Sequence, residues 1–294
     1  MSLDQHKTAA TTLVAKMVAT GRCVIAYSGG VDSAVVAAAV ARADQIRLGD
    51  QPGKGDSRSI AVTADSPSVS REQLATAIRV AGEIGIDHRI VQTGEMDRED
   101  YRRNDRRRCF FCKHTLYGEL QRFAAASQIT TLVSGTNADD LGDYRPGIEA
   151  GNLAGVATPL ASLGFSKQQV RDVAEYWKLS VFDRPAQPCL SSRVAYGVAV
   201  TRERLASIEL AEQFLRTRHY TPLRVRLVAA EEARIEVSLD SLDRLRQPAE
   251  WQAICDHLQS LGFSKVSADP QGFRSGSMNE LVQLTSRPLP MSPT

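Results

Sequence analysis

The sequence predicts an α/β protein with a doubly wound parallel sheet, followed by a small α+β domain. Three observations indicate this fold. Short β-rich runs alternate with helical patterns over the first 180 residues, a Gly-rich turn joins the first strand to the first helix of this series, and two prolines near residue 185 interrupt the pattern. With 294 residues and 43% hydrophobic content, the chain can bury cores in about two domains.

The elements of the first domain follow from these patterns. Strands are expected at residues 23–27, 59–63, 88–91 and 131–134, and helices at 31–43, 71–84, 113–126 and 166–177. Ser166 is the expected cap of the last of these helices. Residues 49–57, rich in Gly, Asp and Lys, are predicted to form a surface loop.

The second domain begins after a Pro-containing segment. Pro185 and Pro188 cannot continue a helix, so we place the boundary between residues 180 and 200. A helix at 201–218, strands at 223–228 and 233–237, a helix at 248–261 and a strand at 264–268 are expected beyond it. The resulting assignment is 1–190 for the first domain and 191–285 for the second. Residues 286–294, with three prolines, are predicted to be a poorly ordered tail.

Charge and cysteine content narrow the function classes. The 36 Lys and Arg residues nearly balance 34 Asp and Glu, which does not indicate a general nucleic-acid or membrane binder. No apolar run reaches the roughly 20 residues of a bilayer span, and the polar start lacks the core of a secretory signal. A cytoplasmic protein without a membrane partner is therefore expected. Its five cysteines, an odd number, favour metal or catalytic thiols over disulfides.

The sequence S-G-G-V-D-S at residues 28–33 lies between a predicted strand and a predicted helix. This context directs backbone N–H groups and a helix N-terminus at an anion, and phosphate is the natural ligand. Gly29 and Gly30 permit close approach, the hydroxyls of Ser28 and Ser33 can donate to phosphate, and Asp32 can assist Mg²⁺. An ordinary capped turn, with Asp or Ser as the cap, is the alternative.

This hexapeptide resembles the PP-loop of N-type ATP pyrophosphatases, which activate a carbonyl or carboxylate as an adenylate. The resemblance implies that residues 1–190 form an ATP-binding domain. The expected ATP contacts are Ser28, Gly29, Gly30, Val31, Asp32, Ser33, Thr63, Ala64 and Gly135. Asp139 and Asp140, after a later strand, are candidate metal ligands, with a solvated acidic turn as the alternative for either one.

Three cysteines form the second signal. Cys109 and Cys112 are spaced to chelate one metal centre, and Cys189, in a Pro-flanked loop, can add a third thiolate. Three thiolates suit a four-iron four-sulfur (4Fe-4S) cluster with one unique iron, and His114 keeps a zinc site open as an alternative. Cys23 and Cys255 are expected in cores. The basic residues 102–108 favour a thiolate or a polyanionic substrate, or form a solvated face.

Further motifs decide the family resemblance. They are D-Y-R-P-G at 143–147, P-C-L-S-S-R at 188–193 with Y-G at 196–197, L-R-V-R at 223–226 and G-F-R-S-G at 272–276. With the PP-loop, over about residues 10–285, they resemble the LarE family. Members of that family make the thiolated pyridinium mononucleotide from which the nickel-pincer nucleotide cofactor of lactate racemase is completed.

The resemblance assigns roles to individual residues. In one branch the cysteine matched by Cys189 gives up its own sulfur. The additional Cys109 and Cys112 resemble the three-cysteine branch, in which a 4Fe-4S cluster carries an extra sulfide. Lys113 and Arg193 are then candidates for holding the substrate or the acyl-adenylate phosphate. A homo-oligomer such as a hexamer and a separate sulfide source are also implied.

The second domain supplies the remaining candidates. Arg224 and Arg226 alternate along a predicted strand, so both side chains point to one face and are expected to clamp the mononucleotide phosphate. Glu212 and Glu236 match the family pattern and are expected at a metal or subunit-interface site, with exposed ion pairs as the favoured alternative.

Two other functions stay open at this point. The basic residues 102–108 favour a PP-loop thiolase acting on tRNA, but a net charge of +2 and the absence of a recognisable RNA-binding module weigh against it. A non-catalytic nucleotide- or zinc-binding module, with structural cysteines, is the other alternative.

Overall fold

The computed structural model describes residues 3–49, 58–142 and 146–274. The predicted loop beyond Gly49, the tail at 286–294 and parts of two motifs, residues 143–145 and 275–276, lie outside these ranges. The chain forms two compact units. The first consists of Met1–Arg98 and Arg107–Gln187, and the second of Glu99–Arg106 and Pro188–Thr294. Glu99–Arg106 and Cys189 thus belong to the second unit, although the sequence assignment placed both within residues 1–190.

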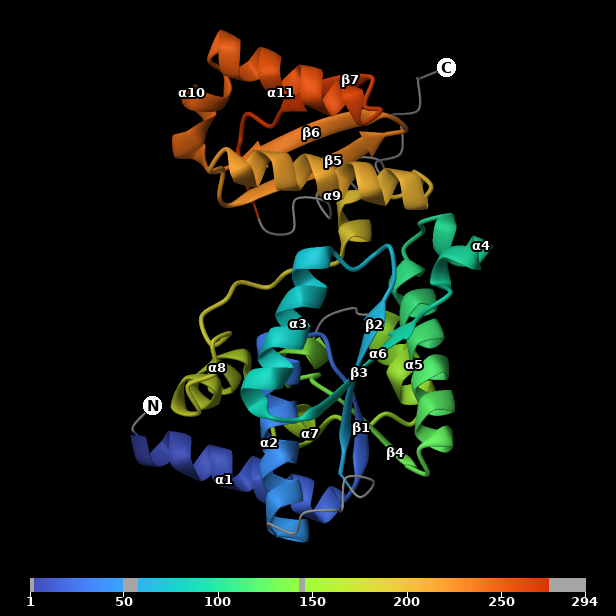
Figure 1. Cartoon of the computed structure of the whole chain (residues 1–294), viewed down its shortest axis with the longest axis vertical. Coiled ribbons are helices and arrows are strands. Elements are labelled where there is room, and N and C mark those ends of the chain that lie inside the picture. The colour runs from blue at the N-terminus through green and yellow to red at the C-terminus, as the bar shows by residue number, and fades with distance from the viewer. Residues whose placement is uncertain (1–2, 50–57, 143–145, 275–294) are drawn as a thin grey trace, which may run out of the picture. The chain divides into compact units, whose positions relative to one another are not determined.

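The first unit is built on a parallel four-stranded sheet (Figure 1). Its strands are β1 (Cys23–Ala26), β2 (Ile60–Asp65), β3 (Asp87–Gln92) and β4 (Thr131–Ser134), in the order β3-β2-β1-β4. All three pairings are parallel. The predicted α/β fold with a doubly wound parallel sheet is confirmed. The chain crosses from one side of β1 to the other before β4, so the loops after β1 and β4 flank a switch point.

Helices cover both faces of this sheet. α2 (Val31–Leu48) and α3 (Arg71–Ile84) bury Cys23, Ile25 and Ala61 on one face, with α1 (Leu3–Thr20), α7 (Pro159–Ser162) and α8 (Lys167–Tyr176) in the same core. α5 (Arg108–Ala126) and α6 (Pro146–Leu153) bury Val24 and Val62 on the other. The buried residues alternate along each strand because successive side chains point to opposite faces.

The helix boundaries depart from the sequence prediction at functionally relevant places. α5 begins at Arg108, five residues before the predicted start at 113, so Cys109 and Cys112 lie within its first turns. α8 begins after Ser166, whose hydroxyl accepts from the backbone N–H of Gln169 as the predicted cap. α1 was not predicted.

The second unit is a three-stranded sheet with helices. The order is β5 (Leu223–Ala229), β6 (Glu232–Val237), β7 (Lys265–Ala268), with β5 and β6 antiparallel and β6 and β7 parallel. α9 (Arg202–Thr217) packs against β5, and α11 (Pro248–Ser260) against α9 and β7, while α4 (Glu99–Arg102) and α10 (Leu242–Leu245) are single turns. No helix in the described ranges is long and apolar enough to cross a bilayer.

Candidate functional site

The loop at residues 28–33 follows β1 and opens α2, as the sequence predicted. The N-cap of α2 is Gly30, which has no side chain to occupy the N–H groups of the first helical turn. These N–H groups have no partner within a helix, and the positive end of the helix dipole adds to them. An 18-residue helix with this opening is suited to bind an anion at the carboxyl edge of the sheet.

Hydrogen bonds hold the loop in shape. The Ser33 hydroxyl donates to the Gly30 carbonyl at 3.0 Å and accepts from the Ser28 backbone N–H at 3.2 Å. The two serine hydroxyl oxygens are 3.1 Å apart. These hydrogen bonds fix the conformation of the loop, so little conformational entropy would be lost when an anion binds.

Two glycines allow backbone segments to approach this loop closely. Gly29 has a φ of 72°, and a Cβ there would lie 2.6 Å from the Cα of Ala77 on α3. Gly135, the residue after β4, approaches from the other side, where a Cβ would lie 2.7 Å from the backbone nitrogen of Ser33. A side chain at either position would displace the loop. Gly135, a predicted ATP contact, thus lies against the loop at residues 28–33.

Asp32 has partners that the sequence prediction missed. Lys167, the first residue of α8, forms an ion pair with it, and Asn137 donates to its other oxygen at 3.1 Å. The side chains of Lys167 and Asp32 are 35% and 26% exposed, so both remain accessible from solvent. The available signal was the capped start of α8, which puts a lysine at a helix N-terminus, where a cation is unfavourable unless it has an anionic partner.

The acidic pair after β4 has a local role. Asp139 accepts a hydrogen bond from the Lys167 backbone N–H at 2.8 Å, and Asp140 accepts one from the Asn137 backbone N–H at 3.1 Å. Both carboxylates therefore fix the turn that carries Asn137 and meets α8. Their candidate role as metal ligands stays a prediction.

The end of β2 lies at the same carboxyl edge of the sheet as the loop at residues 28–33. The Thr63 hydroxyl is 2.8 Å from Nε2 of His88 on β3, so this side chain is already engaged. Asp65 accepts from Arg71 at 2.6 Å and from Gln92 at 2.9 Å. The Arg71 hydrogen bond holds the pKa of Asp65 below its usual range. Contacts of Thr63 and Ala64 with a nucleotide would therefore come mainly from their backbone.

Cys109, Cys112 and Lys113 lie at the start of α5 in the first unit. Cys109 and Lys113 are exposed and Cys112 is half-buried. α6 packs closely here, because a Cβ on Gly147 would lie 3.0 Å from Cγ of Lys113. The Lys113 ammonium lies 5.8 Å from the centre of the Tyr117 ring. α6 therefore supports the lysine stem while its head stays accessible.

Cys189 lies in the second unit and is held by Arg193. One guanidinium nitrogen of Arg193 donates to the Cys189 carbonyl at 2.9 Å and also to the Pro188 carbonyl. Its other nitrogens donate to the two carboxylate oxygens of Glu212 at 3.0 and 3.2 Å. Arg193 is 4% exposed. This geometry makes Arg193 a positioning residue for the Cys189 loop.

Glu212 connects this loop to β5. It accepts from Arg193, from Arg216 at 3.1 Å and from the Val225 backbone N–H at 3.2 Å. Glu236 on β6 accepts from Arg226 at 3.1 Å. The expectation of exposed ion pairs was wrong for both glutamates, since they are 1% and 0% exposed. Each is buried with a guanidinium partner because an isolated buried carboxylate would be costly.

The two predicted phosphate-clamping arginines have different environments. Arg226 is 6% exposed, pairs with Glu236 and donates to the Ser192 carbonyl at 3.1 Å. Arg224 is half-buried, donates to the Leu223 carbonyl at 2.8 Å, and forms no ion pair with a carboxylate among the described residues. Burial, with the neighbouring Arg193, lowers the pKa of Arg224 to about 10, so it stays charged at neutral pH.

The remaining two cysteines differ from the three predicted ligands. Cys23 is fully buried in β1, and burial raises the pKa of its thiol to about 12. Burial also raises the pKa of Cys255 in α11. Cys109, Cys112 and Cys189 form no disulfide and are at least partly exposed, which fits the donor set of a thiolate-ligated metal group. The prediction of core positions is confirmed for Cys23, whereas Cys255 is partly exposed.

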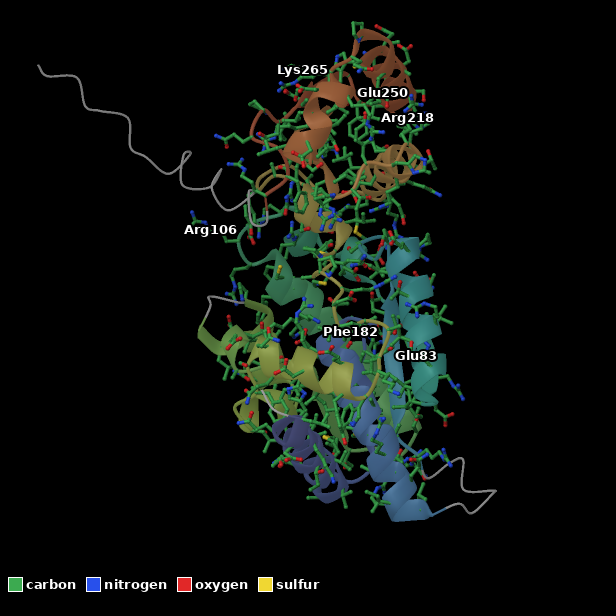
Figure 2. All side chains as sticks on the ribbon, turned by 90° about the vertical axis from the view of Figure 1, so that its left-hand side faces the viewer. Glu83, Arg106, Phe182, Arg218, Glu250 and Lys265 are labelled. Carbon is green, nitrogen blue, oxygen red and sulfur yellow. The ribbon has the colours of Figure 1, made fainter. Side chains whose placement is uncertain are left out.

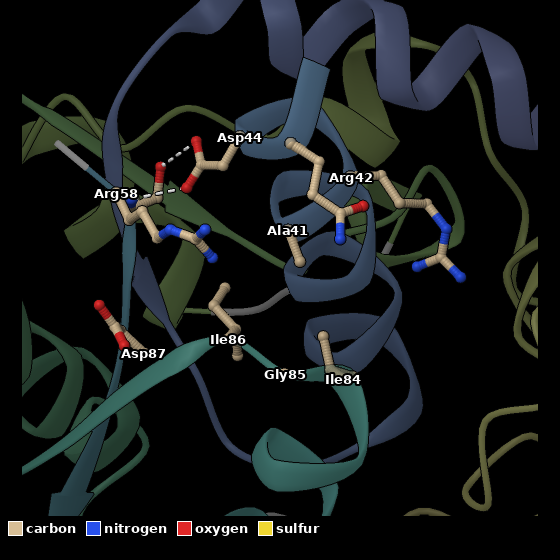
Figure 3. Close-up of a pocket in the computed structure, with 10 residues that line it drawn as sticks. Ala41, Arg42, Asp44, Arg58, Ile84, Gly85, Ile86 and Asp87 are labelled. Carbon is tan, nitrogen blue, oxygen red and sulfur yellow. Dashed lines mark hydrogen bonds between the residues drawn. The ribbon is translucent and has the colours of Figure 1, made fainter. Parts of the chain in front are cut away.

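A cavity of about 260 Å³ lies at the opposite end of the first sheet (Figure 3). It is lined by the end of α2, the start of β2 and the turn between α3 and β3. Asp44 at its edge accepts from the backbone N–H of Ser59 at 2.7 Å and from its hydroxyl at 3.2 Å. Because phosphate loops of such sheets lie at the carboxyl ends of the strands, this cavity is separate from the candidate nucleotide site.

Comparison with known proteins gives a full-length relationship. No protein-family model matches the chain. The chain is 30% identical over 277 residues to the pyridinium-3,5-bisthiocarboxylic acid mononucleotide synthase of Lactiplantibacillus plantarum, covering 92% of this chain and 94% of that enzyme. The chain belongs to the LarE family. The family predicted from the motifs is thereby confirmed, and the iron–sulfur branch stays a prediction.

Two further relatives extend along the same length. An uncharacterised protein of Synechocystis, slr1717, is 40% identical over 263 residues, or 89% of this chain and 93% of that protein. The uncharacterised MJ0830 of Methanocaldococcus jannaschii is 25% identical over 254 residues, or 86% and 91%. Because the match to the Lactiplantibacillus plantarum synthase covers 92% of the chain, it includes residues 28–33 of the first unit and residues 189–226 of the second.

Proposed function

We propose that this LarE-family protein is an ATP-dependent sulfur transferase that converts a carboxylate of a pyridinium dicarboxylate mononucleotide to a thiocarboxylate, for nickel-pincer nucleotide synthesis. The observation that carries the proposal is the loop at residues 28–33, which opens α2 without a side-chain cap and in which Asp32 pairs with Lys167. It occurs in a full-length relative of a pyridinium bisthiocarboxylate synthase. This loop suits ATP phosphates, and the relative indicates the acceptor.

The first half-reaction is adenylylation. ATP phosphates bind the N–H groups at the start of α2, and Asp32 turns from Lys167 to Mg²⁺, which leaves the lysine ammonium for a phosphate oxygen. A substrate carboxylate oxygen attacks the α-phosphorus, and pyrophosphate leaves with the electron pair of the broken bond. The protein contributes positioning and charge neutralisation to this step.

The second half-reaction replaces oxygen by sulfur. A sulfur atom attacks the acyl carbon, and AMP leaves with the former carboxylate oxygen. A 4Fe-4S cluster bound by Cys109, Cys112 and Cys189 would supply that sulfur atom and would be replenished by an external sulfide source. Lys113, exposed beside Cys112, would bind the acyl-adenylate phosphate, and Arg193 would keep the Cys189 loop in position through the Cys189 carbonyl.

Arg224 is the better candidate of the two arginines for the substrate phosphate. Arg226 already has Glu236 and the Ser192 carbonyl as partners, whereas Arg224 is half-buried and forms no ion pair with a carboxylate among the described residues, although Glu212 is near enough to act on its charge. An anion that reaches Arg224 gains a charge-assisted hydrogen bond and balances a poorly hydrated charge. The phosphomonoester of the mononucleotide meets this requirement.

The decisive experiment is anaerobic reconstitution with iron and sulfide, then incubation with ATP and pyridinium-3,5-biscarboxylic acid mononucleotide, with mass analysis of protein and product. We expect a brown protein, substrate-dependent release of pyrophosphate and AMP, a thiocarboxylate product and an unchanged protein mass. Loss of one H₂S from Cys189 would show that this cysteine gives up its own sulfur and would overturn the cluster assignment. Colourless, zinc-loaded protein without pyrophosphate release would overturn the enzymatic assignment.

Two controls address the remaining expectations. Filter binding with bulk tRNA at physiological salt should show no tight complex, and a tight complex would transfer the same chemistry to an RNA substrate. We also expect a cytoplasmic homo-oligomer, as in the family resemblance. Light scattering during size-exclusion chromatography measures that mass, and a monomer would contradict the expectation.

A further inference from the structure

Arg224 is held in place by an aromatic ring. Its guanidinium carbon lies 5.3 Å from the centre of the Phe273 ring, within the range of a cation–π contact. Among the described residues, its guanidinium forms one hydrogen bond, from Nη1 to the adjacent Leu223 carbonyl. Its neighbours Arg193 and Arg226 are held by carboxylates. Arg224 is thus restrained in a chemically different way.

Phe273 is fixed by a turn that is attached to β6. Asp269 donates its backbone N–H to the Ile235 carbonyl at 2.8 Å, and its side chain accepts from the Gln271 backbone N–H at 2.8 Å. Gly272 has a φ of 67°, and a Cβ there would lie 2.8 Å from the Val237 carbonyl oxygen. The Phe273 backbone N–H then donates to that same oxygen at 2.7 Å.

The position of this turn follows from strand register. In the backbone register of the two strands, Arg224 on β5 lies opposite Glu236 on β6. The backbone of Phe273 is hydrogen-bonded to the residue after Glu236, Val237. The ring is therefore presented to the strand that carries Arg224. A positive φ at Gly272 and its close approach to β6 make glycine necessary at this point of the turn.

We propose that Phe273 is a positioning residue that orients Arg224 for the phosphate of the mononucleotide substrate while leaving guanidinium N–H groups available to it. This inference rests on the proposed phosphate role of Arg224. A carboxylate partner would orient the guanidinium equally well, but it would occupy the donors and repel a phosphate. A ring contacts the face of the guanidinium and occupies no donor, so the positive charge stays available.

The test uses Phe273→Leu, with Phe273→Tyr as the conservative variant. Phe273→Leu should raise the KM for pyridinium-3,5-biscarboxylic acid mononucleotide about 5-fold, while kcat and the KM for ATP change less than about 2-fold. Phe273→Tyr should retain wild-type values because it keeps the ring face. By calorimetry, Phe273→Leu should weaken binding of the mononucleotide but not of the corresponding nucleoside, which has no phosphate.

Phe214→Leu is the matched control. Phe214 also lies beneath a guanidinium, that of Arg218, at 5.5 Å, but Arg218 already donates to Glu250 at 2.9 Å, and these two labelled residues are neighbours in Figure 2. This substitution should leave the substrate KM unchanged. A comparable rise in KM for Phe214→Leu would mean that loss of any ring in the second unit has this effect, and would overturn the proposal.

Arg224→Gln separates the two levels of inference. If Arg224→Gln leaves the affinity for the mononucleotide unchanged, the proposed phosphate role of Arg224 is wrong. If Arg224→Gln weakens mononucleotide binding but Phe273→Leu does not, or if Phe273→Leu weakens nucleoside binding equally, only the positioning role of Phe273 is wrong. Thermal unfolding of each variant verifies that the measured molecules are folded.

Discussion

In the first unit, Asp32 and Lys167 pair with side chains that are 26% and 35% exposed, whereas Glu212 and Arg193 of the second unit pair at 2% and 5%. The first pair lies beside the loop at residues 28–33 and is accessible to solvent, so it could be exchanged for Mg²⁺ and phosphate if ATP binds as proposed. The second pair is enclosed and supports the Cys189 backbone. The difference indicates that the ion pair at the start of α2 can change partners, whereas the one beside Cys189 is fixed.

The strongest way to break this comparison is Glu212→Gln. Removing one partner of a buried ion pair leaves Arg193 uncompensated, so we expect a loss of about 3 kcal/mol in the free energy of unfolding and a large loss of turnover. Urea denaturation measures the first quantity. Glu250→Gln is the control, since its pair with Arg218 is more exposed and should change stability by about 1 kcal/mol or less. Equal effects of the two substitutions would contradict the fixed-charge interpretation.

Gly135→Ala tests the first unit by geometry. The added methyl group would lie 2.7 Å from the Ser33 backbone nitrogen and must displace the phosphate loop. We expect pyrophosphate release to fall about 100-fold, because small misplacements of catalytic groups have effects of this size. In the control Gly118→Ala, in α5, a Cβ meets nothing within 4 Å. That variant should be as active as wild type, and an unaffected Gly135→Ala enzyme would remove this loop from the reaction.

Lys167→Met sharpens the claim that the exposed pair is exchangeable. The substitution removes one charged donor to phosphate, so the KM for ATP should rise about 10-fold while the fold is retained. Steady-state pyrophosphate release at varied ATP measures this value. Lys16→Met, on the exposed side of α1, should leave it unchanged. A Lys167→Met enzyme with wild-type ATP kinetics would mean that the lysine serves only to neutralise Asp32.

The smallest expected effect concerns His88, which is partly buried and forms no ion pair with a carboxylate among the described residues. Burial, with Arg89 nearby, lowers the pKa of His88. As the pH falls through about 6.5, the usual pKa of histidine, His88 is protonated more in the unfolded chain than in the folded protein. The free energy of unfolding therefore decreases as the pH falls. His88→Gln should lose less stability than wild type between pH 7.5 and pH 5.5 in urea denaturation. A wild-type protein that becomes more stable over this interval would contradict the sign.

The sequence predicted those parts of the candidate site whose residues are neighbours along the chain. Residues 28–33 bring strand, turn and helix start together in one hexapeptide, so its local context was readable. Lys167 lies 135 residues from Asp32, and the capped start of α8 marks the lysine but does not reveal its partner. The start of α5 was predicted at residue 113, whereas the helix begins at Arg108, at the end of the basic run that was predicted to form a solvated face or to favour a thiolate or a polyanionic substrate.

Glu212 shows a signal that was present and misread. Leu205, Ile208 and Leu215 are buried on α9, and Glu212 falls on the same helical stripe by its spacing. A carboxylate within an apolar stripe predicts a buried partner. The partner itself, Arg193, is brought to it by tertiary structure, which the spacing of one helix does not reveal.

The burial of Cys23 has a consequence for sulfur transfer. In a protein that transfers sulfur, a reactive thiol outside the site would compete for the transferred sulfur. With a pKa of about 12 and no exposed surface, Cys23 stays protonated and out of reach, so it neither accepts sulfur nor forms mixed disulfides. Alkylation of the native protein should therefore label Cys109, Cys112, Cys189 and the partly exposed Cys255, and should spare Cys23.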